Sequence, residues 1–145
     1  MRYTVLFGVL ALGVASAAAQ NIEAIKARQA TYKAMAAATK RPADMLKGAT
    51  PFDMEVVQAA LDVYVDAGKR LPGLFPDDSK TGNETQALPV IWEQKDDFNK
   101  RVAKFDADAQ AAKVAIKDEA SFKTEFPKVI GNCGACHNVY RAKGK

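Results

Sequence analysis

Residues 133–137, near the C-terminus, read Cys133-Gly134-Ala135-Cys136-His137. Two thiols three positions apart, with an imidazole directly after the second, match the requirements of covalent haem attachment. Each thiol can add across one vinyl group of the haem, and the adjacent histidine can reach the iron. His137 is also the only histidine in the 145-residue sequence. The sequence therefore predicts one haem c, bound covalently through Cys133 and Cys136, with His137 as the metal ligand.

Two other uses of the cysteine pair are less favoured. A disulfide across two intervening residues usually opens a helix that follows a strand, and the chain shows no convincing pattern of that kind. A structural zinc site needs four ligands, whereas two cysteines and one histidine supply three. Haem attachment is therefore the preferred interpretation.

The N-terminal residues have the pattern of a secretory leader. Arg2 supplies a positive start, an apolar run follows, and residues 17–19 are all alanine, as the cleavage rule requires. A membrane anchor is disfavoured because the apolar run is short for a span and no basic cluster follows it. We expect a cleaved signal peptide at residues 1–19, a mature domain at residues 20–145 beginning with Gln20, and export to the periplasm of a bacterium.

The charge balance gives little support for a nucleic-acid or membrane partner. The formal net charge of the whole chain is +4, and loss of Arg2 with the leader reduces it to +3. Two haem propionates would reduce it further, and the basic residues are scattered apart from Arg141, Lys143 and Lys145. We expect no nucleic-acid partner and no membrane anchor. The length suits one domain with one core.

Four stretches carry apolar or small residues at alternating steps of three and four, which is typical of helices packed in a bundle. They cover residues 22–39, 54–71, 91–116 and 122–140. Residues 72–88 should form a long surface connection, whereas the other linkers are short. The predicted fold class is all-α: an antiparallel up-and-down four-helix bundle with a covalently attached haem.

Capping residues and prolines predict where these helices begin, bend and end. Asn21 should cap the first helix, which should fade before Pro42, with a bent continuation as the alternative. Thr50-Pro51 resembles a cap followed by the first-turn proline of the second helix. Pro127 should bend or restart the last helix one turn before the haem motif.

Helical spacing places the haem inside the bundle. Residues at i, i+3 and i+4 share one face of a helix, and Cys133, Cys136 and His137 occupy these three positions. The second axial position of the iron stays open at this point, because the chain has no second histidine. The methionines that follow the leader all precede the haem motif: Met35, Met45 and Met54. The common small c-type cytochromes instead carry their methionine ligand downstream of the motif.

Four segments carry a resemblance to a known family. They are residues 25–32 with the Arg28-Gln29 pair, residues 74–76, residues 87–92, and residues 129–137 followed by Tyr140-Arg141. With these segments and the C-terminal position of its haem motif, the chain resembles cytochrome c′, the class II c-type cytochromes, over nearly all of residues 20–145.

The resemblance implies a homodimer and a high-spin, five-coordinate haem with His137 as the sole axial ligand. Tyr32 would block the distal face of the iron without binding it. Arg28 and Gln29 form the family signature and are assigned to the haem site, with Arg28 on a haem propionate. Arg141 would border the proximal pocket. From the residues alone, Tyr32 could also be ordinary core, and the two arginines could be surface charges.

The expected function is the binding of small gases, nitric oxide and carbon monoxide, to ferrous iron, with nitric oxide capture or tolerance as the role. Electron transfer to an unknown redox partner is compatible with it. The alternative is a low-spin cytochrome in which a methionine such as Met35 is the sixth ligand, acting as a plain electron carrier. An enzyme such as a peroxidase is not expected, because no distal histidine is available for acid–base chemistry.

Overall fold

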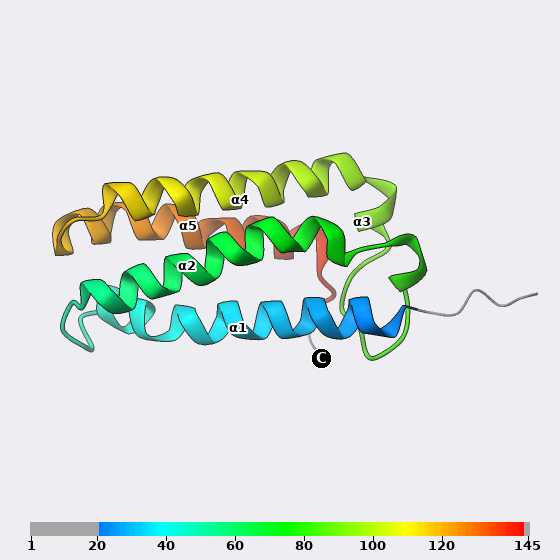
Figure 1. The fold of residues 1–145 in the computed structure, drawn as a ribbon, viewed down its shortest axis with the longest axis horizontal. Coiled ribbons are helices and arrows are strands. Elements are labelled where there is room, and N and C mark those ends of the chain that lie inside the picture. Colours follow the sequence, from blue (N-terminus) through cyan, green and yellow to red (C-terminus); the bar gives the residue numbers. More distant parts are fainter. Residues whose placement is uncertain (1–20, 144–145) are drawn as a thin grey trace, which may run out of the picture.

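A computed structural model describes residues 21–143, and the predicted signal peptide lies outside them. Four long helices lie side by side as an up-and-down bundle (Figure 1), so the predicted all-α fold is confirmed. In the described part of the chain, the only strand-like pairing is an isolated bridge between Ala87 and Arg141. The helical elements are α1 (Ile22–Leu46), α2 (Met54–Arg70), the 3₁₀ turns η1 (Leu71–Leu74) and η2 (Asp77–Ser79), α3 (Val90–Glu93), α4 (Lys95–Ala115) and α5 (Glu119–Tyr140).

The first helix begins as predicted and ends later than predicted. The side chain of Asn21 accepts a hydrogen bond from the backbone N–H of Ala24 at 2.9 Å. The helix continues through Pro42 to Leu46, so the expected fading before Pro42 is wrong, and the continuation given as the alternative is confirmed. Pro42 is fully buried and Met45 is 3% exposed. Burial of these side chains offsets the backbone hydrogen bond that a proline removes.

The second helix begins at Met54, and its cap is Asp53 rather than Thr50. The Asp53 carboxylate accepts from the N–H of Val56 at 3.2 Å, which places Pro51 outside the helix. Thr and Asp are both good capping residues, so the local pattern alone did not separate the two positions.

The last two predicted helices also differ in detail from the structure. The predicted stretch 91–116 is broken at Gln94, which separates the short α3 from α4. By contrast, α5 is one helix from Glu119 to Tyr140, so Pro127 does not restart it. Pro127 lies on the exposed face, where the carbonyl that loses its N–H partner can be hydrated.

The helices do not all pack on one another. α1 packs on α2, α2 on α4, and α4 on α5, whereas α1 and α5 hardly touch. α2 and α4 approach closely at Gly68, where an added Cβ would lie 2.6 Å from the Cβ of Asp106. In the described residues, no helix is long and apolar enough to cross a membrane.

Candidate functional site

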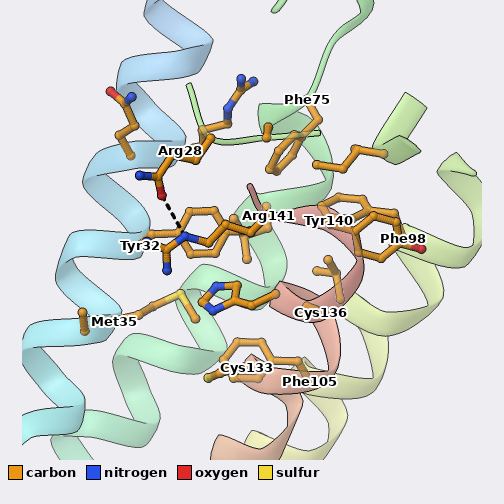
Figure 2. A pocket seen from close by; sticks show the side chains of 18 of the residues that line it. Arg28, Tyr32, Met35, Phe75, Phe98, Phe105, Cys133, Cys136, Tyr140 and Arg141 are labelled. Carbon is orange, nitrogen blue, oxygen red and sulfur yellow. Dashed lines mark hydrogen bonds between the residues drawn. The ribbon is translucent and has the colours of Figure 1, made fainter. Parts of the chain in front are cut away.

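The space between α1 and α5 is a cavity of about 700 Å³ with mainly apolar walls (Figure 2). Side chains of all four long helices and of the connection between α2 and α3 line it. A cavity of this size and character is typical of a binding site for a small molecule or cofactor. The site residues predicted from the sequence all lie on its wall: Arg28, Gln29, Tyr32, Cys133, Cys136, His137 and Arg141.

α5 contributes both thiols and the imidazole from one face. Cys133 and Cys136 are free cysteines and are half-buried. Burial raises the pKa of both thiols. The pKa of His137 is lowered, first by burial and second by the neighbouring Arg141 guanidinium. The imidazole is therefore held in the neutral form that binds a metal ion.

α1 places Tyr32 opposite His137. The two rings meet edge to face, with centroids 6.3 Å apart and an interplanar angle of 61°. Burial is the main cause that raises the pKa of Tyr32, so its phenol stays protonated at neutral pH. Met35, one turn further along α1, lines the same cavity and is 9% exposed. Both residues that the sequence offered for the distal face are therefore on the cavity wall.

Arg28 is a buried cation that ties the long connection to α1. Its side chain is 2% exposed, so the alternative of a surface charge is wrong. Its NH1 donates to the Oγ of Ser79 at 2.8 Å and to the carbonyl of Leu74 at 3.3 Å. Its NH2 donates to the carbonyl of Ser79 and to the Oγ1 of Thr85, each at 2.8 Å. The guanidinium also lies 4.8 Å above the ring of Phe75.

Gln29 of α1 and residues 83–87 of the connection close one end of the cavity. Gln29 and Asn83 exchange two hydrogen bonds of 2.9 Å, one through each side-chain amide. Asn83 has a φ of 44° and Glu84 a φ of 51°, a left-handed conformation that forms a tight turn here. Glu84, Thr85 and the two residues after them reach the cavity wall.

The end of α5 is fastened to this same turn. The Nε of Arg141 donates to the Oε1 of Gln86 at 2.8 Å, and the N–H of Ala142 donates to the Gln86 carbonyl at 2.8 Å. The N–H of Leu88 donates to the carbonyl of Tyr140 at 3.0 Å. The cavity thus has a polar end, formed by the start of α1, the connection and the end of α5, and an apolar interior.

Sequence reasoning missed several residues of this end. Ser79, which is 0% exposed, and Gln86 gave no signal, because each is a polar residue in a polar connection. Tyr140 was placed on the apolar face of the last predicted helix and in the family match, and was not assigned to the site, yet it lines the cavity. Their roles depend on contacts with residues more than 40 positions away, which spacing does not reveal.

This arrangement fits a haem. Two thiols and a neutral imidazole project from one helix face into an apolar space, and cationic side chains lie at its polar end, as a macrocycle with two carboxylates at one edge requires. Zinc is a poor fit, because the described residues contain no group of three or more histidine, cysteine or acidic side chains that could hold a metal ion.

Comparison with known proteins decides the family. The family model described as Cytochrome C′ matches residues 23–141. The chain belongs to the cytochrome c′ family. It is 48% identical to a cytochrome c′ of Rhodopseudomonas palustris, over 99% of this chain and 97% of that protein. It is also 34% identical to a cytochrome c-556 of Agrobacterium fabrum, over 95% and 91% of the two chains.

Solved structures agree with the sequence match. The structure of a cytochrome c′ from Rhodopseudomonas palustris superposes with a TM-score of 0.82 at 51% identity, covering 84% of this chain and 98% of that one. Family membership establishes this chain as a c-type haem protein. The predicted covalent haem c is therefore confirmed, with Cys133 and Cys136 as the attachment pair.

Proposed function

We propose that this cytochrome c′ holds a five-coordinate haem, with His137 as the only protein ligand, and binds nitric oxide or carbon monoxide on the opposite face. The observation that carries the proposal is the ring of Tyr32, which faces His137 across the cavity. A protonated phenol is a weak metal ligand, and the raised pKa of Tyr32 keeps it protonated. Tyr32 therefore guards the distal face without occupying the sixth position.

The walls of the cavity favour small neutral ligands. Tyr32, Met35 and Phe105 line it with largely apolar surface, so an entering anion would lose its hydration without gaining a partner. Nitric oxide and carbon monoxide lose little hydration and are small enough to pass beside a tyrosine ring. Capture of nitric oxide, or tolerance of it, follows as the proposed role.

The polar end of the cavity suits the haem carboxylates. Among the described residues, the guanidinium of Arg141 has the neutral side-chain amide of Gln86 as its one hydrogen-bond partner. Arg28 has four neutral acceptors and no carboxylate within ion-pair distance among the described residues. Both cations therefore support the proposal that propionates lie here, with Gln29 holding the turn that closes this end.

The second candidate is a low-spin electron carrier with Met35 as the sixth ligand. It is supported by the position of Met35 on the cavity wall, one helical turn from Tyr32. The two candidates differ in optical spectrum. A five-coordinate iron gives high-spin spectra in both oxidation states, whereas methionine ligation gives low-spin bands and a weak far-red band in the ferric protein.

The direct test is the rate of carbon monoxide binding to ferrous Tyr32→Ala. If Tyr32 blocks the iron, association should accelerate by at least about tenfold, the factor that corresponds to a barrier lowered by about 1.4 kcal/mol. Met35→Leu is the matched control, because it changes the other distal side chain and keeps its volume. An unchanged rate in Tyr32→Ala, or a low-spin wild-type spectrum that Met35→Leu converts to high spin, would contradict the proposal.

We further propose export to the periplasm, with removal of residues 1–19, a mature domain of residues 20–145 that begins with Gln20, and assembly as a homodimer. The leader pattern supports export, and the family match supports the dimer. The mass of the protein secreted by a bacterial host tests the cleavage site, and sedimentation at micromolar concentration tests the dimer. No nucleic-acid partner is proposed.

A further inference from the structure

Three tyrosines line the cavity, and their hydroxyl groups meet different surroundings: Tyr32, Tyr64 and Tyr140. The phenol of Tyr64 lies 2.6 Å from the hydroxyl of Thr39. That of Tyr32 has no carboxylate partner among the described residues. The phenol of Tyr140 donates to the Oδ2 of Asp97 at 2.5 Å. Tyr140 alone therefore combines contact with the cavity and a basic group on its O–H.

This difference determines which tyrosine can give up an electron. Removing one electron from a phenol makes its O–H strongly acidic, so oxidation is accessible only when the proton can leave at the same time. A carboxylate can accept that proton, whereas a neutral hydroxyl such as that of Thr39 is a far weaker base. Hydrogen bonds from Tyr140 and then from Arg101 lower the pKa of Asp97, so this carboxyl group is ionised at neutral pH, and it can accept the proton once oxidation has made the phenol strongly acidic.

The surroundings of Asp97 let the proton continue to solvent. The Nε of Arg101 donates to the Oδ2 of Asp97 at 2.8 Å and holds the carboxylate in place. The side chain of Asp97 is 49% exposed, whereas Tyr140 is 3% exposed. The phenol is thus shielded from water, whereas the carboxylate that accepts its proton is in contact with water.

Tyr140 also lies next to the haem-binding residues. It follows Cys136 by four positions and His137 by three on α5, the spacings that place side chains on one helix face. Figure 2 shows Tyr140 and Cys136 on the same helix, with Phe98 of α4 beside the tyrosine. The Phe98 and Tyr140 rings meet edge to face, with centroids 5.3 Å apart, which fixes the tyrosine against the cavity wall.

We propose that Tyr140 and Asp97 form a proton-coupled electron relay, which returns an electron to the haem group after a hydroperoxide has oxidised it. The relay rests on the proposed open iron position, because the hydroperoxide must reach the iron. Reduction of hydrogen peroxide would take two electrons from the haem group and two protons from solvent, break the O–O bond and release two water molecules. Tyr140 would return one of the two electrons, and its phenol proton would move to the Oδ2 of Asp97. A neutral tyrosyl radical, a protonated carboxyl and a haem group that still lacks one electron would remain, and a reductant from solution would supply that electron and quench the radical.

The relay gives this protein a protective function that gas binding does not require. An oxidising equivalent that stays on the haem attacks the macrocycle or the apolar wall. On Tyr140 it lies beside a carboxylate in contact with solvent, where a reductant from solution can quench it. Trp92, which is part of the same series of aromatic contacts through Phe75 and Phe98, donates its N–H to backbone carbonyls and has no carboxylate partner within residues 21–143. It is therefore not the site at which the radical settles.

The experiment mixes the ferric holoprotein with one equivalent of hydrogen peroxide, freezes it within milliseconds and records the electron paramagnetic resonance spectrum. Wild-type protein should show a tyrosyl radical whose signal narrows when the tyrosines are ring-deuterated. The signal should be lost in Tyr140→Phe, which keeps the ring, and mostly lost in Asp97→Asn, which keeps the shape and removes the base. Tyr64→Phe is the matched control and should keep the signal. Haem bleaching should be faster in the first two variants.

The opposite outcomes are equally clear. A tyrosyl signal that survives in Tyr140→Phe, or that disappears in Tyr64→Phe instead, overturns the relay. If Asp97→Asn lowers the melting temperature but leaves the signal unchanged, the pair is only a clamp between α4 and α5, and the relay is again overturned. A wild-type haem whose optical spectrum does not respond to peroxide overturns both the open iron position and the relay. A haem that responds without forming the radical overturns the relay alone.

Discussion

Replacing Arg28 by methionine should destabilise the protein by removing the contacts that hold the long connection on α1. Methionine keeps much of the apolar stem that packs near Phe75, and it removes every donor. Four acceptors then lose their hydrogen bond from Arg28: the carbonyls of Leu74 and Ser79 and the hydroxyl oxygens of Ser79 and Thr85. Ser79 is 0% exposed, so water does not reach its two acceptors without movement of the connection.

The expected loss can be worked from these contacts. Each buried acceptor left without a partner costs about 1–3 kcal/mol, which gives about 2–6 kcal/mol for the two on Ser79. The burial that lowers the pKa of Arg28 shows that the buried charge itself opposes folding, and methionine relieves that cost. The net loss in the free energy of unfolding should be about 2–4 kcal/mol. Arg28→Lys should recover less than half of it, because one ammonium group does not reach acceptors on three residues.

The assay is unfolding of the holoprotein in guanidinium chloride, combined with hydrogen exchange of residues 74–85. Arg41→Met is the matched control: the arginine lies on the same helix, its side chain is 67% exposed, and its ion pair with Asp53 is 3.6 Å long. That control should stay within about 0.5 kcal/mol of wild type. A loss below about 1 kcal/mol in Arg28→Met, or unchanged protection of residues 74–85, would refute the account of Arg28 as the residue that holds the connection.

Two further predictions concern helix packing and helix capping. Gly68→Ala should lower the free energy of unfolding by about 1–2 kcal/mol, because the new Cβ would lie 2.6 Å from the Cβ of Asp106 and overpacking outweighs the gain in helix propensity. At Gly131 in α5, an added Cβ would meet no neighbouring side chain or helix within 4 Å, so Gly131→Ala should instead raise the free energy of unfolding by about 1 kcal/mol. Equal effects of the two substitutions in denaturant titrations would contradict the close approach of α2 and α4 at Gly68. Hydrogen bonds from the hydroxyl and N–H of Ser121 lower the pKa of Asp118 at the start of α5, so its stabilising effect is complete above the unfolded-state pKa and is lost as the pH falls below about 4. Asp118→Asn keeps the cap, so its melting temperature should fall less steeply in this range, and identical pH profiles would count against the assignment.

Local spacing was enough to predict most of the helices and the attachment of the haem. The apolar residues that were spaced three and four apart in α2, α4 and α5 are mostly buried, as Leu61, Phe105 and Phe126 show. The predicted inward face of the first helix, residues 22–39, is less accurate: Ile25 is buried in the core, whereas Gln29 faces the cavity and bonds to the long connection. The pattern of one helix does not distinguish the face that meets another helix from the face that meets a cofactor.

The proline positions show a second limit of the sequence. Pro42 and Pro127 both lie inside helices. The first helix was expected to fade before Pro42, and Pro127 was expected to bend or restart the last helix. A proline costs a helix about 3 kcal/mol, and tertiary packing of the flanking turns can offset that amount. The cost is local and visible in the sequence, whereas the compensation depends on what packs against the helix.

The sequence by itself determined that haem is attached at Cys133 and Cys136, that His137 can bind its iron, and that these side chains share a helix face. Each conclusion depends on residues within five positions of one another, where covalent geometry and helical periodicity leave little choice. Only the tertiary structure decided that Arg28 is buried in the long connection and that Tyr140 meets Asp97. These pairs are separated by more than 40 residues, and their contact follows from how the helices and the connection pack together.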